Sequence, residues 1–318
     1  MILDGIYGEV VSARNALYDR RIFKPRHLNW PVVSVGNISA GGSGKTPFVI
    51  ALGELLLKKG IGIDVLSRGY RRSTSGVMKV DPSGTPEQFG DEPLLIARKL
   101  RCPVIVGESR YSAGVYAEDE GAGASQNRMH LLDDAFQHRQ LHRDFDIVLL
   151  NTEDLDDKLL PSGRLRESIA SLLRADAVVV DCEFPIGRLP KGKFQLWHIE
   201  RKMEIPEFQS PVIAFCGIAR PQRFFDALRS AVVDLRKEIA FRDHHRYTAA
   251  DVQRLTAIRT GLPGSMLVTT EKDAVNLGAH LDKLRPVVIP MKIELQDSEN
   301  AIKHLLGILA ERAVCPHL

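Results

Sequence analysis

Short apolar runs alternate with helical patterns along most of the chain. The runs predict buried strands, and apolar residues that recur every three or four positions predict helices between them. The predicted strands are 31–36, 61–66, 104–106, 129–134, 147–150, 177–180, 211–215, 238–241, 266–269 and 287–290. The main helices are predicted after the first strand and over 94–100, 221–233 and 301–310. This alternation predicts an α/β fold with a parallel sheet in each half.

The N-terminal segment combines an apolar stripe with a basic end. Apolar residues recur at helical spacing from Leu3 to Leu17, and basic residues gather between positions 14 and 26. Such a helix can lie in the interface of an anionic membrane. The alternative is a helix that packs on the rest of its domain and exposes its basic end to water. The spacing by itself favours this second interpretation.

A glycine-rich loop separates the strand 31–36 from the helix that follows. It reads Ser39-Ala40-Gly41-Gly42-Ser43-Gly44-Lys45-Thr46. Glycine has no Cβ, so backbone N–H groups can approach phosphate oxygens closely, and the helix N-terminus adds partial positive charge. Strand, glycine-rich loop and helix together indicate a P-loop, in which Lys45 reaches the β- and γ-phosphates and Thr46 ligates Mg²⁺. The usual pattern has glycine where this chain has Ser39.

Two carboxylates end the predicted strand 129–134. Asp133 and Asp134 follow the P-loop in the chain, where the aspartate partner of Mg²⁺ is expected. Mg²⁺ usually takes only one or two protein carboxylates, so the second one can instead position a water or a phosphate partner. The alternative is a turn acid or a helix cap. The P-loop upstream favours the metal role.

Further candidate residues follow other predicted strands. Asp91 precedes a helical run, so it either caps that helix or accepts a proton from an attacking hydroxyl. The basic loop 67–72 either holds a substrate phosphate or is a solvated turn. Arg166 and Glu167 lie in a polar loop, from which they can face phosphate and the metal respectively.

The second half carries one histidine pair in the sequence Asp243-His244-His245. Adjacent residues point apart, so the pair is not expected to bind one metal. A single histidine paired with a carboxylate and a solvated loop histidine remain alternatives. Thr270 and Asp273 have the spacing of a capping box.

Composition and charge narrow the class of protein. The 318 residues suggest about two domains, and 44% hydrophobic with 26% charged residues is typical of globular chains. No apolar stretch reaches ~18 residues, so no membrane-spanning helix is predicted. A net charge of +3 is too small to indicate nucleic acid as a partner. The cysteines Cys102, Cys182, Cys216 and Cys315 form no C-x-x-C motif, and the N-terminus lacks a signal-peptide pattern, which fits a reducing cytosol.

Taken together, these motifs resemble those of the tetraacyldisaccharide 4′-kinases, the ATP-dependent lipid A precursor kinases of bacteria. The matching stretches are SVGNISAGGSGKTP, SRGYRR, GDEP, LLDDAFQHRQLHRDFDIVLL, LPSGRLRES, RDHHRY and TTEKDAV. They follow the family order over about residues 31–276, and LDDAFQHR is more specific than the P-loop itself. The family usually has a longer and more hydrophobic N-terminal segment than this chain.

The resemblance implies transfer of the ATP γ-phosphate to the 4′-hydroxyl of a tetraacyldisaccharide 1-phosphate, which gives lipid IVA. It implies a P-loop kinase domain over 1–172, a second, smaller α/β domain over 173–295, and an active site in the cleft between them. A helix over about 296–318 is expected to pack back on the first domain. The expected location is the cytoplasmic face of the inner membrane, held there peripherally, with no obligate protein partner.

The resemblance also assigns roles to residues. Asp91 is the expected catalytic base with His244 as its partner, and Lys45 is expected to act on the transferred phosphate. The residues expected to bind ATP are Ser39, Ala40, Gly41, Gly42, Ser43, Gly44, Lys45, Thr46 and Arg166. The residues expected around Mg²⁺ are Thr46, Asp133, Asp134 and Glu167.

Two other functions fit parts of the sequence. A soluble P-loop kinase for a sugar or nucleoside is compatible with the small net charge and the modest N-terminal helix. A P-loop ATPase that switches a protein partner is the second alternative. A meeting of the GDEP and DHH motifs would disfavour this switch.

Overall fold

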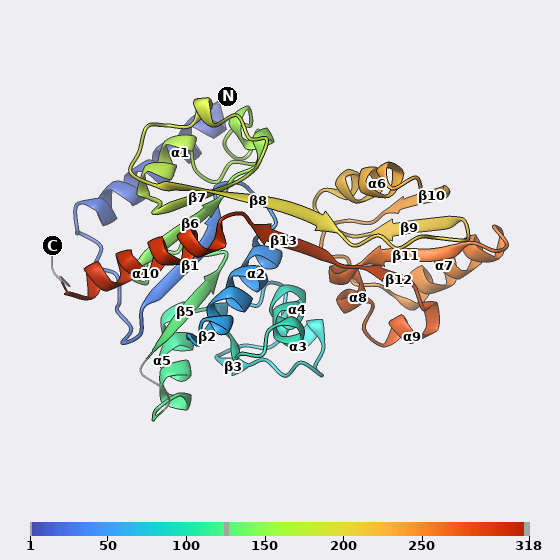
Figure 1. The fold of residues 1–318 in the computed structure, drawn as a ribbon, viewed down its shortest axis with the longest axis horizontal. Coiled ribbons are helices and arrows are strands. Elements are labelled where there is room, and N and C mark those ends of the chain that lie inside the picture. Colours follow the sequence, from blue (N-terminus) through green and yellow to red (C-terminus); the bar gives the residue numbers. More distant parts are fainter. Residues whose placement is uncertain (1, 124–126, 315–318) are drawn as a thin grey trace.

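The strands form two sheets in the computed structural model, which describes residues 2–123 and 127–314 (Figure 1). The larger sheet has nine strands in the order β13-β8-β7-β6-β1-β5-β2-β4-β3. Their bounds are β1 Val32–Asn37, β2 Gly62–Ser67, β3 Met78–Lys79, β4 Val104–Val106, β5 Arg128–Asp133, β6 Phe145–Leu149, β7 Ala177–Asp181, β8 Gln195–Met203 and β13 Met291–Leu295. All neighbours are parallel except the two edge pairs, β3 with β4 and β13 with β8.

The smaller sheet has four parallel strands in the order β10-β9-β11-β12. Their bounds are β9 Val212–Cys216, β10 Leu235–Ala240, β11 Met266–Thr270 and β12 Val287–Ile289. The α/β fold predicted from the alternating pattern is confirmed.

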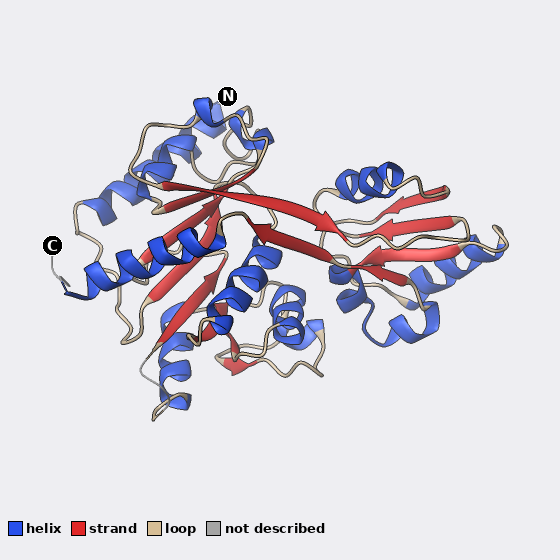
Figure 2. Ribbon diagram, viewed as in Figure 1, coloured by secondary structure: helices blue, strands red, loops and turns tan. Residues whose placement is uncertain are grey.

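Helices cover both faces of the two sheets (Figure 2). Their bounds are α1 Ile2–Asp19, α2 Lys45–Lys58, α3 Pro86–Phe89, α4 Asp91–Lys99, α5 Arg110–Glu120, α6 Pro221–Ser230, α7 Ala249–Thr260, α8 Glu271–Leu277, α9 Leu281–Leu284 and α10 Ser298–Val314. On the large sheet, α2, α4 and α10 contribute to the core of one face. On the other face, α5 and the short 3₁₀ helix 169–174 do the same.

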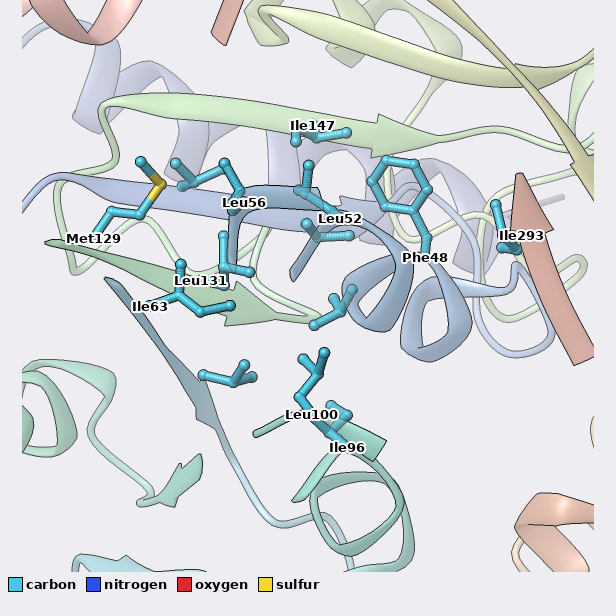
Figure 3. Close-up of a cluster of buried hydrophobic side chains, with 14 of the residues drawn as sticks. Phe48, Leu52, Leu56, Ile63, Ile96, Leu100, Met129, Leu131, Ile147 and Ile293 are labelled. Atoms are coloured by element: carbon cyan, nitrogen blue, oxygen red, sulfur yellow. The ribbon is translucent and has the colours of Figure 1, made fainter. Parts of the chain in front are cut away.

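The helix after the glycine-rich loop is fixed by its apolar stripe. Phe48, Leu52 and Leu56 recur every four residues, and each is at most 1% exposed. They face Leu131 and Ile147 of the central strands (Figure 3). Burying a side chain of this size stabilises a fold by about 1.5–3 kcal/mol, so this stripe holds the loop rigidly at the end of β1.

The link between the two sheets differs from the sequence prediction. The strands β8 and β13 form an antiparallel pair that extends from the large sheet toward the small one (Figure 1). The sequence pattern predicts no strand at β8 and makes 287–290 the last strand, which is wrong because β13 follows it. Both strands alternate between polar and apolar residues, which is typical of a strand with one solvated face rather than of a buried parallel strand.

The predicted domain limits can be compared with the pairing of the strands. Beyond residue 172, where the second domain was predicted to begin, β7 and β8 still pair within the large sheet. The small sheet contains only strands between residues 212 and 289. Ala301, Ile302 and Leu305 of α10 lie in the core of the large sheet. The division into two domains stays a prediction. Along the chain, the strands leave the large sheet after β8 and return to it at β13.

Smaller details also differ from the prediction. The helix predicted over 221–233 ends at Ser230, and Val232 has a positive φ of +56°. Cys102, Cys182 and Cys216 are free thiols, and Cys315 lies outside the described residues. None of the helices in the described ranges is long and apolar enough to span a bilayer.

Candidate active site

The glycine-rich loop lies at the carboxyl end of β1, and three of its glycines adopt left-handed backbone conformations. The φ angle is +73° at Gly41, +65° at Gly42 and +82° at Gly44. A Cβ at Gly41 would lie 3.1 Å from the Cβ of Ala219, and one at Gly42 would lie 2.8 Å from the Cγ of Arg220. Both the positive φ angles and the atoms close to the missing Cβ require glycine at these positions. The loop is also in close contact with the segment before α6.

The start of this loop is tied to the polar loop that precedes Arg166. The backbone N–H of Ala40 donates to the carbonyl of Arg164 at 2.7 Å, and Ser39 forms an isolated bridge with Leu165. Asn37 donates its side-chain amide to the carbonyl of Ser39 at 2.7 Å. Ser39 is therefore buried in extended backbone, which any residue adopts, and this explains why glycine is not needed there. Nucleotide contacts of Ser39 and Ala40 stay predictions.

Lys45 points into a polar cluster at the end of the central strands. Its ammonium donates to Asn37 Oδ1 at 3.1 Å and to Ser43 Oγ at 3.4 Å. It also forms an ion pair with Asp134 Oδ1 at 3.3 Å. The predicted phosphate lysine and one predicted metal ligand are thus brought together.

Asp134 lies between two cations. Arg166 donates from Nη1 to both carboxylate oxygens, at 3.0 and 3.1 Å. Burial alone would raise the pKa of Asp134, but the charges of Lys45 and Arg166 outweigh it and lower the pKa to about 2. The three residues that sequence reasoning assigned to phosphate and metal form one ionised network.

Asp133 is in a different environment, although it is the next residue. It is buried at the end of β5, and Ser67 donates to its Oδ2 at 3.4 Å. Burial raises the pKa of Asp133 to about 7, and the carboxylates of Glu92 and Asp134 add to the effect. Its Oδ1 is buried without a hydrogen-bond partner among the described residues. A buried carboxylate oxygen of this kind, beside a second carboxylate, is a donor set that suits a hard cation such as Mg²⁺.

Glu167 anchors the N-terminal helix to the site. Its Oε2 accepts from Asn15 at 2.7 Å and from Arg174 at 2.9 Å, and its Oε1 accepts from Gln137 at 3.1 Å. Within the described residues no group of three His, Cys, Asp or Glu side chains could hold a metal by itself. The metal role of Glu167 stays a prediction. Its hydrogen bonds show that this carboxylate holds other segments of the protein together.

Asp91 and His244 meet although 153 residues separate them in sequence. His244 Nδ1 lies 2.8 Å from Asp91 Oδ2, and Asp91 is only 5% exposed. The helix α4 begins after Gly90 without a side-chain cap, so Asp91 is the first helical residue and not the N-cap considered for it. The carboxylate instead faces the histidine from the small sheet. Asp91 also accepts the backbone N–H of Glu92 at its Oδ1, at 2.9 Å.

The charge state of Asp91 follows from its neighbours. Burial alone would raise its pKa, but the hydrogen bond from His244 and the charge of Lys272 outweigh it, so the pKa lies well below the usual range. Asp91 is therefore ionised at neutral pH.

The loop that carries His244 is held by the basic loop after β2. Arg71 donates to the carbonyls of Asp243 and His244, both at 3.1 Å, and the Tyr70 ring packs edge-on against the His244 imidazole at 5.2 Å. A Cβ at Gly41 would lie 3.9 Å from Asp243 Oδ2, so the histidine loop also approaches the glycine-rich loop. Of the two adjacent histidines, His245 turns to Asp251 at 3.0 Å, whereas His244 faces Asp91.

Three residues of this region were not among the predicted site residues. Lys272 Nζ lies 3.2 Å from His244 Nε2, and Asn276 donates to Asp91 Oδ2 at 3.0 Å. Arg201 of β8 donates to the carbonyl of Ser43 at 3.2 Å. The motif TTEKDAV contained a signal for Lys272, because it places a charged helix start at the end of a strand. Thr270 caps that helix, since its hydroxyl accepts from the N–H of Asp273, but the reciprocal half of the predicted capping box is not formed: the Asp273 carboxylate accepts the Thr270 hydroxyl instead.

Fold and site together define a class. A parallel α/β sheet whose first strand leads through a glycine-rich loop and Lys45 into a helix is the architecture of a P-loop phosphotransferase. A family model described as tetraacyldisaccharide-1-P 4′-kinase matches residues 1–310. The chain belongs to this family.

Individual relatives agree with the family model. The chain is 44% identical to the tetraacyldisaccharide 4′-kinase of Koribacter versatilis over 98% of both sequences. It is 34% identical to that of Aquifex aeolicus, over 95% of this chain and 96% of the relative. The crystal structure of LpxK from Aquifex aeolicus in complex with ATP superposes with a TM-score of 0.77 and 32% identity, covering 96% of this chain and 97% of the other.

The predicted activity is therefore confirmed. The chain is an ATP-dependent kinase that transfers the γ-phosphate to the 4′-hydroxyl of tetraacyldisaccharide 1-phosphate in lipid A biosynthesis, forming lipid IVA. The comparisons do not favour the small-molecule kinase or the ATPase switch.

Proposed function

We propose that this kinase performs its reaction where the glycine-rich loop, Asp134 and the Asp91–His244 pair converge. The observation that carries the proposal is the 2.8 Å contact between Asp91 and His244, which joins the two sheets beside the glycine-rich loop. A carboxylate paired with a histidine has no evident use in a nucleotide switch. It is suited to an acceptor that must lose a proton, such as a sugar hydroxyl.

The glycine-rich loop binds the phosphates of ATP in this proposal. Backbone N–H groups of residues 41–44, beyond the bond from Ala40 to Arg164, cradle them, and the positive end of α2 adds to the attraction. Lys45 exchanges its ion pair with Asp134 for the β- and γ-phosphates. Arg166, which is part of the same network, faces the transferred phosphate. Both cations then neutralise charge on the phosphoryl group during transfer.

The residues fit a Mg²⁺ ion in the site. Thr46, Asp133 and Asp134 would hold it, with Glu167 at the border of the site. The unpartnered Oδ1 of Asp133 and the repulsion between neighbouring carboxylates are the observations that support this assignment. When bound, the ion supplies charge neutralisation for the phosphates.

Asp91 acts as the general base on the 4′-hydroxyl. Its Oδ2 already accepts from His244 and Asn276, whereas its Oδ1 accepts, among the residues that the structure describes, only the N–H of Glu92. Oδ1 is thus the oxygen that retains room to accept the hydroxyl proton. His244 orients the carboxylate through its ring N–H. Loss of such a base usually lowers the rate by about 10²–10⁴-fold.

The N-terminal helix associates peripherally with the cytoplasmic face of the inner membrane. One side of α1 is fixed to the protein through Tyr7, which donates to the carbonyl of Arg166, and through Asn15. Ile6 and Val10, one turn apart on the helix, are 52% and 62% exposed. Exposed basic residues between positions 20 and 26 follow. An apolar face beside a basic segment fits an anionic lipid surface, where the acylated substrate also resides.

An acceptor assay tests the proposal. Purified protein is incubated with γ-³²P-labelled ATP and tetraacyldisaccharide 1-phosphate in mixed micelles, with a nucleoside, with a free disaccharide, or without acceptor. We expect label in the lipid alone, and its loss in Lys45→Ala. Label in a small acceptor, or phosphate release that does not depend on the lipid, would contradict the proposed chemistry.

A further inference from the structure

The two ring nitrogens of His244 face groups of opposite charge. Nδ1 lies 2.8 Å from Asp91 Oδ2, and Nε2 lies 3.2 Å from the ammonium of Lys272. The nearest carboxylate oxygen to Nε2 in the described part of the chain is Asp243 Oδ2 at 3.8 Å, beyond hydrogen-bond distance. The side chain of His244 is 14% exposed, so these groups and the Tyr70 ring largely define its surroundings.

Lys272 is held in its charged form by three carboxylates. Its Nζ lies 3.2 Å from Glu92 Oε1, 3.6 Å from Asp243 Oδ1 and 4.0 Å from Asp91 Oδ2. Burial alone would lower the pKa of Lys272, but these carboxylates outweigh it and raise the pKa above its usual value. An ammonium group has three N–H donors and no acceptor. Lys272 can therefore only donate to the imidazole.

A donor at Nε2 determines where the imidazole carries its proton. Nε2 must offer its lone pair to Lys272, so the proton of the neutral ring resides on Nδ1. The Nδ1–H then donates to Asp91, which accepts as a carboxylate. The opposite tautomer would place two donors against each other at Nε2 and two lone pairs against each other at Nδ1.

We propose that Lys272 is a positioning residue for phosphoryl transfer, which fixes His244 as the neutral Nδ1–H tautomer and so directs its hydrogen bond at Asp91. The inference rests on the proposed role of Asp91 as base. Lys272 acts through His244 and does not itself touch the reacting hydroxyl.

The fold provides this arrangement through one short helix. Thr270 caps α8 at the end of β11, and Lys272 and Asn276 follow at i and i+4, on one face of the helix. That face packs on α4, where Asp91 and Glu92 form the first turn. Asn276 donates to the same Asp91 oxygen as His244, at 3.0 Å. One helix of the small sheet thus supplies two of the contacts that orient the base on the large sheet.

Removal of the ammonium should change the pH dependence of the reaction. In the wild type the ammonium of Lys272 lies 3.2 Å from Nε2, so this nitrogen serves only as a hydrogen-bond acceptor. In Lys272→Met, Nε2 is free to take a proton under the influence of Asp243 and Glu92. The resulting imidazolium pairs more strongly with Asp91 and weakens it as a base, so the acid side of the kcat profile should move to higher pH.

The experiment compares Lys272→Met and Lys272→Arg with the wild type at saturating ATP and lipid, between about pH 5.5 and pH 9. For Lys272→Met we expect kcat to fall about 10–100-fold, the acid limb to move to higher pH, and KM for ATP to change less than about 3-fold. Arginine keeps the charge and the donors, so Lys272→Arg should recover most of kcat and the wild-type profile. Lys283→Met, on exposed α9, is the matched control and should behave as the wild type.

A double mutant separates positioning from simple structural support. If Lys272 acts through His244, adding Lys272→Met to His244→Ala should cause less than about a 2-fold further loss of kcat. Losses that multiply, an unshifted profile in Lys272→Met, or a Lys272→Arg variant as slow as Lys272→Met would each overturn the inference. Thermal unfolding identifies a variant that fails to fold, and Lys272→Gln then replaces methionine. Failure of the proposed function itself is distinct, because wild-type protein would then leave the lipid unlabelled.

Discussion

The substitution Asp91→Asn tests the proposed base with little change in shape. In the wild type, Oδ2 accepts from His244 at 2.8 Å and from Asn276 at 3.0 Å, and Oδ1 accepts from the N–H of Glu92 at 2.9 Å. Asparagine has one oxygen and one NH₂ group. Its NH₂ group must therefore face an N–H donor, either that of Glu92 or those of His244 and Asn276. A mismatch of this kind in a buried site costs about 1–3 kcal/mol of stability.

The effect on catalysis is larger and separable. Asparagine cannot accept the hydroxyl proton, so kcat should fall about 10²–10⁴-fold, which corresponds to about 3–5 kcal/mol on the barrier. The rate of lipid phosphorylation at saturating ATP and lipid measures this effect. Asp282→Asn, on exposed α9, is the matched control and should retain full activity. Equal kcat values for Asp91→Asn and the wild type would refute the assignment of Asp91 as the base.

The difference in stability between Asp91→Asn and the wild type should depend on pH. The hydrogen bond from His244 and the charge of Lys272 outweigh burial and lower the pKa of Asp91, so its ionised form stabilises the folded state. This contribution is present above the unfolded pKa of about 3.9 and is lost as the pH falls toward the lower folded value. Thermal unfolding from about pH 7 to pH 3 should therefore show a Tm gap between wild type and Asp91→Asn that narrows below about pH 4. A gap that stays constant over this range would contradict the charge assignment.

Three further outcomes are expected. Lys45→Ala should reduce kcat by about 10²-fold or more, because the phosphates lose their main protein cation, whereas Lys45→Arg should retain part of the wild-type kcat. Normal transfer by Lys45→Ala would remove the lysine from the mechanism. Gly42→Ala should raise KM for ATP and destabilise the fold by about 1–2 kcal/mol, since φ is +65° and the new Cβ would lie 2.8 Å from Arg220 Cγ. An unchanged KM with an unchanged Tm would contradict the proposed close approach of the loop backbone to the phosphates. The double substitution of exposed Ile6 and Val10 by aspartate should weaken binding to anionic vesicles while Tm changes by less than about 3 °C; undiminished binding in a flotation assay would place the membrane contact elsewhere.

Much of the chemistry is readable in local sequence because it is local in structure. Phe48, Leu52 and Leu56 define the helix after the glycine-rich loop, and three glycines of that loop have the positive φ angles that glycine adopts most readily. The carboxylates at the end of β5 follow from a buried strand that stops at two charged residues. These features depend on contacts within a few turns of chain. The resemblance to the kinase family added the pairing of Asp91 with His244, which no periodicity could supply.

The tertiary structure decided which partner each charged side chain takes. A carboxylate such as Asp91 has the same local pattern whether it caps a helix or faces a histidine, and only the packing of the small sheet against α4 settles the matter. Glu167 was assigned to the metal by motif, yet its three donors come from segments far apart in the chain, including α1. Lys272 had no assigned role in the sequence, because the carboxylates of Asp91 and Glu92 reach it only when the two sheets meet. The sequence determined the elements and the P-loop, since these arise from short-range periodicity and backbone preference. The structure determined the network around the base, since Coulomb and hydrogen-bond energies depend on distance, and the partners of Asp91 lie more than a hundred positions from it along the chain.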